Sequence, residues 1–155
     1  VPTGAATDGE VEDYQISIGG LTVSGTVYND SNHNSQLDSG ETGTGLALFA
    51  KFILASTPAG PALAAVAVDA GSGAYAFNGA NPETYRIIID DNATLSDVTP
   101  TLPAGWIGTQ IPNQIRPSVA VVSENVPNQN FRLFNGSRLS GAVFIDNGAG
   151  GGTPN

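Results

Sequence analysis

Apolar residues occur in this chain as short runs rich in Val, Ile, Thr and aromatic side chains. The 155-residue sequence has 20 glycines and 10 prolines between these runs, and both residue types end strands and form turns. No segment sustains the 3.6-residue apolar period of an amphipathic helix, and the best candidate is a weak one at 61–68. Short strands between turn signals favour an all-β fold, an antiparallel β-sandwich.

The longest apolar run, 45–55, suits a central strand, whereas the other runs are β-branched or alternate weakly. Trp106 is the only tryptophan, and we expect it to fill a core or edge position rather than to form a ligand platform. Strands are predicted at 21–28, 45–55, 63–69, 74–77, 84–89, 118–122 and 130–134.

Composition argues against several classes of function. The chain has no cysteine, and its only histidine, His33, lies in a polar loop, where we expect it to point to solvent rather than to act as a base; this disfavours the usual nucleophile–base arrangements of enzymes. Fourteen acidic residues against five basic ones give a net charge of −9, which repels nucleic acid and anionic membranes and attracts divalent cations. No apolar run approaches the roughly 20 residues of a membrane span. We expect a non-enzymatic protein without nucleic-acid binding or membrane insertion.

One loop has the oxygen spacing of a calcium site. Residues 30–41 carry Asp, Asn, Asn, Asp and Glu at positions 1, 3, 5, 9 and 12, and the carbonyl at position 7 adds a ligand. Position 6, usually glycine, is Ser35. The alternative is a polar surface loop, because the same residue types build ordinary turns. We predict a Ca²⁺ site whose ligands are Asp30, Asn32, Asn34, Gln36, Asp38 and Glu41.

A repeat indicates how the chain is organised. The pattern of 23–30 (apolar, Ser, Gly, small, Val, aromatic, variable, Asp) returns 116 residues later at 139–146. This offset suits an array of whole domains. The predicted units are the tail of a preceding module or an inter-subunit strand at 1–20, a calcium-binding module at 21–134, and the start of a following repeat or an inter-subunit strand at 135–155.

The second copy of the loop departs from the first. Asp146 matches Asp30 and is a tentative metal ligand, but Gly148 and Gly150 stand where the first copy has asparagines. Two further acidic clusters, at 10–13 and 90–97, are cation candidates, although such clusters are typical of solvated turns.

The residues around the loop resemble a known family. Residues 25–30, with 73–77 and 103–106 further along, are similar to the opening and middle of SdrD B-type repeats; Glu83 departs from that pattern, which has glycine there. The resemblance implies an Ig-like, prealbumin-type (Cna-B-like) sandwich that carries calcium in its first loop and shares terminal strands with neighbouring modules. Residues 8–14 resemble the GEVED signature that closes another bacterial extracellular β-domain.

These resemblances imply a large exported bacterial protein built of tandem modules. We expect a calcium-stabilised structural repeat of a secreted, cell-surface adhesin, with neighbouring copies or modules as partners. The resemblance names no host-surface or glycan target. One alternative is a filament or sheath subunit assembled by β-strand exchange, which flanking strands predicted at 14–18 and 138–145 motivate. Another is a carbohydrate-binding module, although one Trp and four Tyr show no aromatic platform.

Lys51, the only lysine, lies inside the apolar run 45–55. Related adhesin domains join such a lysine to Asn or Asp on the last strand through an isopeptide bond. The resemblance therefore implies a tentative cross-link from Lys51 to Asn128 or Asn130. The alternative is that the lysine stem lies along the sheet and the ammonium reaches water.

Overall fold

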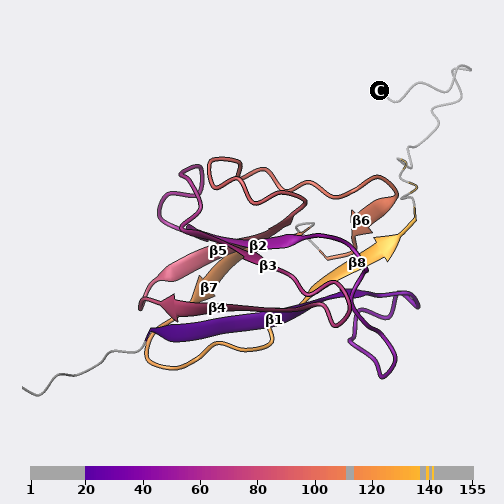
Figure 1. The fold of residues 1–155 in the computed structure, drawn as a ribbon, viewed down its shortest axis with the longest axis horizontal. Coiled ribbons are helices and arrows are strands. Elements are labelled where there is room, and N and C mark those ends of the chain that lie inside the picture. The colour runs from indigo at the N-terminus through magenta and orange to yellow at the C-terminus, as the bar shows by residue number, and fades with distance from the viewer. Residues whose placement is uncertain (1–19, 111–113, 137–138, 140, 142–155) are drawn as a thin grey trace, which may run out of the picture.

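The computed structural model describes residues 20–110, 114–136, 139 and 141. Its regular structure is entirely β, and none of these residues belongs to a helix that could cross a membrane. Eight strands follow one another along the chain (Figure 1): β1 (Leu21–Asn29), β2 (Phe49–Leu54), β3 (Ala64–Ala67), β4 (Ala74–Ala80), β5 (Thr84–Asp90), β6 (Trp106–Gly108), β7 (Ile115–Ala120) and β8 (Phe131–Asn135).

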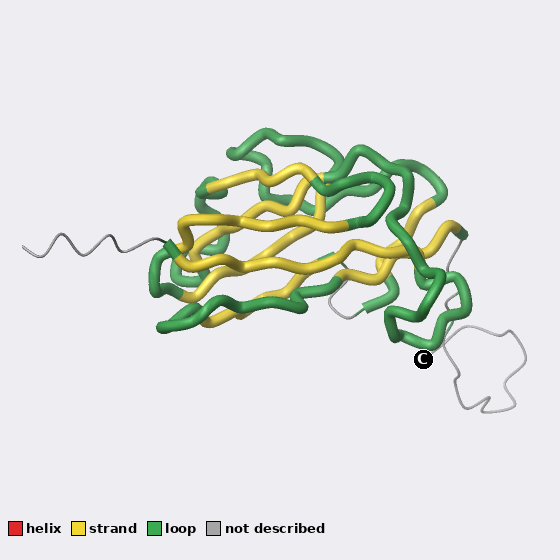
Figure 2. The backbone as a smooth tube through the Cα atoms, turned by 60° about the horizontal axis from the view of Figure 1, so that its bottom comes forward, coloured by secondary structure: helices red, strands yellow, loops and turns green. Residues whose placement is uncertain are grey.

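The strands form two four-stranded sheets that pack as a sandwich (Figure 2). One sheet has the order β4-β1-β8-β6 and the other the order β3-β2-β5-β7. The predicted all-β sandwich is therefore confirmed. One pairing differs from a purely antiparallel arrangement, because β1 pairs antiparallel with β4 over Leu21–Thr26 and parallel with β8 over Val27–Asn29.

The main core lies between the two sheets. It contains Val23 and Val27 from β1, Phe52 from β2, and Phe131 from β8, all fully buried. Aromatic rings cluster there, with the Phe52 ring 4.6 Å from that of Phe77 and 6.2 Å from that of Tyr75. Burial of this apolar surface at about 25 cal/mol per Å² is the main favourable term in folding.

The second sheet is also covered on its outer face, which explains why its central strands are apolar almost throughout. Ile53 of β2 and Ile88 of β5 point away from the main core and pack with Ala62, and Val98 and Ile115 lie against them. A strand that is buried on both faces has no reason to alternate polar and apolar residues.

Two glycines are required by close backbone contacts. A Cβ at Gly25 would lie 2.4 Å from the carbonyl oxygen of Gln129. A Cβ at Gly73 would lie 2.1 Å from the carbonyl oxygen of Val27, and the φ angle of Gly73 is +75°. These two glycines let the turn before β4 and the segment before β8 approach β1.

The strand predictions hold in part. All seven predicted runs overlap strands, but β2 begins at Phe49 rather than at 45, because Gly45 has φ 75° and forms part of the preceding loop. The strand predicted at 118–122 corresponds to β7, which lies three residues earlier at its start and ends at Ala120. The weak helix at 61–68 is wrong, since β3 occupies it, and the three-residue β6 was not predicted.

The eight strands lie within the predicted module boundaries 21–134 plus one residue, Asn135. Most of the predicted flanking units, 1–20 and 135–155, fall outside the described residues, as do the strands predicted at 14–18 and most of 138–145. Trp106 is half-buried at the start of β6 and packs against the main core, as expected for an edge position.

Candidate metal loop and buried lysine cluster

The loop at 30–41 leaves β1 at its parallel junction with β8. The Asp30 N–H donates to the carbonyl oxygen of Leu133 at 2.8 Å, and Asp30 is completely buried. At the other end of the loop, the Asn29 N–H donates to the carbonyl oxygen of Thr42 at 3.2 Å. The loop is therefore closed at its base and anchored to both strands.

Two asparagine side chains donate to the carboxylate of Asp38 within the loop. Its Oδ2 atom accepts hydrogen bonds from the Nδ2 atoms of Asn32 at 2.9 Å and Asn34 at 2.5 Å. These two bonds, Asn32 first, lower the pKa of the Asp38 carboxyl below its ordinary value. The first and middle parts of the loop are thus folded back onto its ninth residue.

Glu41 and Asp30 bind backbone groups of the same loop. Glu41 Oε1 accepts from the Ser31 N–H at 3.1 Å, and Glu41 Oε2 accepts from the Asp38 N–H at 3.2 Å. The Asp30 carboxylate accepts from the Ser35 N–H, at 3.2 Å for its closer oxygen. Both oxygens of the final glutamate therefore face the loop, as bidentate coordination of a hard cation requires.

The sixth position of the loop does adopt the conformation that usually demands glycine. Ser35 has φ 70° and His33 has φ 60°, a region in which a side chain costs roughly 1–2 kcal/mol. The His33 ring packs edge-to-face on Phe134, with the ring centroids 3.9 Å apart. The loop makes its sharp turn in spite of the serine, and its histidine lies against β8.

Negative potential from the loop acts on a neighbouring phenol. Burial, and next the charge of Asp30, raise the pKa of Tyr28 to about 12; Arg132 acts in the opposite direction. An uncompensated set of carboxylates is what attracts a divalent ion.

The structure brings the five predicted side-chain ligands into one hydrogen-bonded loop. The sixth, Gln36, was predicted through its carbonyl; its N–H donates to Asn34 Oδ1 at 2.8 Å. In the described part of the chain, no three His, Cys, Asp or Glu side chains are grouped as a metal site; the predicted ligand set also relies on two asparagine amides and a carbonyl. Asp146 lies outside the described residues.

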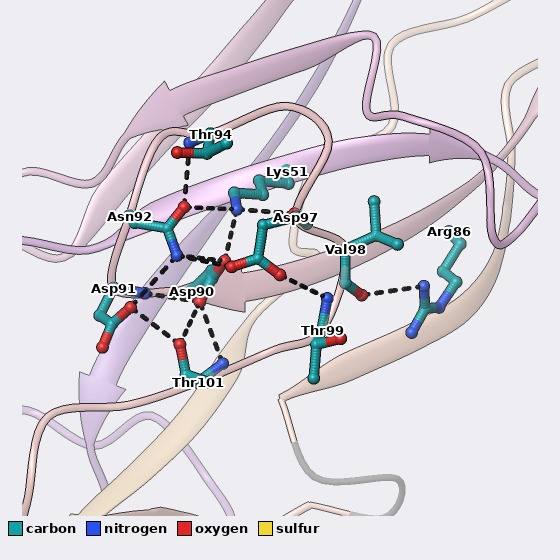
Figure 3. Close-up of polar contacts among 10 residues, drawn as sticks. All are labelled: Lys51, Arg86, Asp90, Asp91, Asn92, Thr94, Asp97, Val98, Thr99 and Thr101. Atoms are coloured by element: carbon teal, nitrogen blue, oxygen red, sulfur yellow. Dashed lines mark hydrogen bonds and ion pairs between the residues drawn. The ribbon is translucent and has the colours of Figure 1, made fainter.

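A second polar cluster surrounds Lys51 in the other sheet (Figure 3). The Lys51 ammonium donates to the Asp90 carboxylate, to Asn92 Oδ1 at 3.1 Å and to the carbonyl oxygen of Asp97 at 2.8 Å. Lys51 and Asp90 are both fully buried. The lysine therefore ends inside the protein, and the alternative in which its ammonium reaches water is not what the structure shows.

The loop that follows β5 supplies the rest of this cluster. Asn92 Nδ2 donates to Asp90 at 3.1 Å and to Asp97 at 3.0 Å, and Thr101 donates its hydroxyl and its N–H to Asp90 Oδ1. Burial raises the pKa of Asp90, but the hydrogen bonds from Lys51 and Thr101 outweigh it, so that the net pKa is below its ordinary value. The acidic cluster predicted as a cation candidate at 90–97 holds the lysine ammonium.

Neither residue of the tentative isopeptide pairing is a hydrogen-bond partner of Lys51. Asn130 Oδ1 accepts from the Thr26 N–H at 3.0 Å, beside the first sheet. Asn128 is exposed and has φ 62°. A measurement of the intact mass tests the predicted cross-link, because forming an isopeptide bond through asparagine releases one ammonia.

The roles of Asp90, Asn92 and Thr101 as partners of Lys51 were missed by sequence reasoning. A signal was available: a lone lysine in an apolar run that is buried on both faces needs a buried carboxylate. Asp90, which follows the apolar run 84–89, was one such candidate.

Comparison with known proteins finds no family model that matches this chain. No curated protein matches it either.

Proposed function

We propose that this chain contains a calcium-stabilised structural module of a large secreted bacterial surface adhesin. The observation that carries the proposal is the loop at 30–41, whose five oxygen-bearing side chains fold back onto a single turn anchored between β1 and β8. The acidic surface and the absence of cysteine support a module that is stabilised outside the cell by a cation in place of disulfides.

Calcium would act on this loop by neutralising carboxylates that otherwise repel each other. Asp30, Asp38 and Glu41 are the anionic members of the set. Extracellular sites of this type bind at roughly 10⁻⁴–10⁻³ M, so they fill outside cells and empty inside. At a large excess of calcium the stabilisation is on the order of 1–3 kcal/mol.

Thermal unfolding of the full chain tests the proposal. We expect the melting temperature to rise in millimolar calcium, to fall back on chelation, and to rise less in equal magnesium, which demands a stricter octahedral geometry. Calorimetric titration should show one site of millimolar or submillimolar affinity. A melting temperature that is the same in calcium and in chelator would contradict a calcium-stabilised module.

A filament or sheath subunit is the second candidate, and one observation favours it. The segment 139–146 repeats the pattern of 23–30. In the structure, residues 23–29 of that pattern belong to β1, an interior strand paired on both sides. A second segment with the same pattern is suited to the same place in a neighbouring copy. Electron microscopy distinguishes the two roles, since ordered fibres favour the filament subunit and single particles favour the adhesin module.

A further inference from the structure

A cavity of about 460 Å³ lies between the 30–41 loop, β7 and the segment that leads into β8. Its lining includes the side chains of Tyr28, Arg116 and Arg132, together with Ser35, Asn128 and Asn130. The cavity thus contains two of the five basic residues of a chain whose net charge is −9.

Neither arginine has a carboxylate partner among the described residues, where the only ion pair is that of Lys51 with Asp90. Arg86, outside the cavity, also lacks one, so what distinguishes Arg116 and Arg132 is that both line the same cavity. Guanidinium groups favour planar, bidentate contact with carboxylates. Two such groups without carboxylate partners at one cavity are the recognition elements of an anion site.

Both guanidiniums are fixed in place by neutral groups. Arg116 donates from Nε at 3.2 Å and from Nη2 at 2.6 Å to the Asn130 carbonyl oxygen, and lies 5.5 Å from the ring centroid of Phe131. Arg132 donates from Nη1 to the Ser35 carbonyl oxygen at 3.2 Å. Because each guanidinium has five donors, donors remain for a ligand, and little side-chain entropy is lost on binding.

Backbone strain marks the same cavity. Ser35 and Asn128 both line it, and they are two of the four non-glycine residues with positive φ in the described ranges. Strained backbone conformations concentrate at binding sites, and the strain here is greater at Ser35, because asparagine adopts the left-handed region more readily.

We propose that this cavity binds carboxylates, and that its occupant is the acidic segment 8–13 of a second copy of this chain. The segment carries four carboxylates in six residues, at Asp8, Glu10, Glu12 and Asp13. In an extended chain Glu10 and Glu12 lie on one side, roughly 7 Å apart, so the segment presents two carboxylates to the two guanidiniums.

This inference rests on the contact between copies in the second candidate function, the filament or sheath subunit, and does not depend on calcium. The two can fail separately. Loss of the calcium effect on melting leaves the peptide experiment below unaffected, and absence of peptide binding leaves the calcium titration unaffected.

The test uses the full 155-residue chain, with its own acidic segment neutralised by D8N, E10Q, E12Q and D13N so that it cannot fill the cavity. This ¹⁵N-labelled protein is titrated with a synthetic peptide of residues 5–16. We expect saturable shifts of the Nε–Hε signals of Arg116 and Arg132. A peptide with the same four amide replacements should cause at least tenfold weaker shifts.

Arginine variants distinguish a specific binding site from nonspecific electrostatic attraction of the peptide. Arg132→Gln should weaken peptide binding at least tenfold. Arg116→Lys should weaken it less, because lysine keeps the positive charge but loses the planar, bidentate geometry of the guanidinium. Arg86→Gln is the matched control, since Arg86 contacts the carbonyls of Pro58 and Val98 instead. Unchanged backbone spectra confirm that each variant is folded.

Three results would overturn the proposal: no arginine shifts with the acidic peptide, equal shifts with the neutral peptide, or an equal loss in Arg86→Gln. Unlabelled wild-type chain must also shift the same signals as its concentration rises. If it leaves them unchanged at concentrations where the peptide binds, a second copy is not the occupant.

Discussion

The ammonium of Lys51 and the carboxylate of Asp90 meet inside the second sheet, where both side chains have no exposed surface. They stand on neighbouring strands, β2 and β5, and their contact brings the loop after β5 under the sheet through Asn92 and Asp97. A buried ion pair contributes little net stability, but removing one partner leaves a charge that nothing compensates.

Replacing the lysine alone should therefore be severe. Lys51→Met leaves Asp90 buried without its cation, and we expect a loss of about 3–5 kcal/mol in the free energy of unfolding. The double variant Lys51→Met with Asp90→Leu should recover part of that loss, because no charge remains. Urea unfolding of the three proteins measures both values. A double variant less stable than Lys51→Met would show that the pair itself is strongly stabilising.

Acid should weaken the fold through the same carboxylate. The folded-state pKa of Asp90 is below its ordinary value of 3.8, so its contribution is present above that value and is lost as pH falls through the folded pKa. We expect the melting temperature to fall steeply below about pH 4. In Asp90→Asn the melting temperature should fall less steeply with decreasing pH, although the variant is less stable than the wild type at pH 7. Equal slopes for the two proteins would assign the acid sensitivity to other groups.

Neutralising the loop should abolish the calcium effect. Glu41→Gln removes a bidentate anionic ligand and Asp38→Asn removes another, so each should lose most of the roughly 1–3 kcal/mol that calcium supplies in excess. In chelator both variants should be slightly less stable than the wild type, because each loses hydrogen bonds that the carboxylate accepts within the loop. Glu83→Gln, at an exposed position outside the loop, is the matched control and should keep the full calcium response. Differential scanning calorimetry with and without calcium makes the comparison.

Glycine at the sixth loop position should suit the turn better than serine. Ser35 has φ 70°, and relief of about 1–2 kcal/mol of left-handed strain exceeds the entropy gained by the unfolded chain, which is about 0.4–1 kcal/mol. Ser35→Gly should therefore raise the melting temperature in chelator and tighten calcium binding. Ser39→Gly, in the same loop but outside the positive-φ positions, should be neutral or destabilising. Equal effects from both glycines would mean that backbone strain at Ser35 is not the cause.

Much of the fold follows from local sequence pattern. The β-branched and apolar runs that became β1, β4, β5 and β8 are each bounded by turn residues, and their strand assignment needs no knowledge of distant contacts. The three residues of β6 are too few to show a period of two, so only their pairing with β8 defines them. The parallel pairing of β1 with β8 joins residues about a hundred positions apart, and no local pattern encodes it.

The candidate loop was predictable because its residues are consecutive and their spacing reflects geometry within a single turn. The lysine cluster was harder, since Lys51 and Asp90 are 39 residues apart and meet only when β2 pairs with β5. The cavity with Arg116 and Arg132 was not predictable at all. Its two arginines come from different sheets, and only the stacking of those sheets brings them to one place.

The parallel contact between β1 and β8 also has a mechanical consequence. Because the first and last strands run in the same direction (Figure 1), Leu21 and Asn135 lie at opposite ends of the sandwich. Tension applied between these residues would act along the strands, and would load their shared hydrogen bonds together in shear instead of opening them one by one. The pairing of β1 with β8 should therefore make this module resist stretching along its long axis.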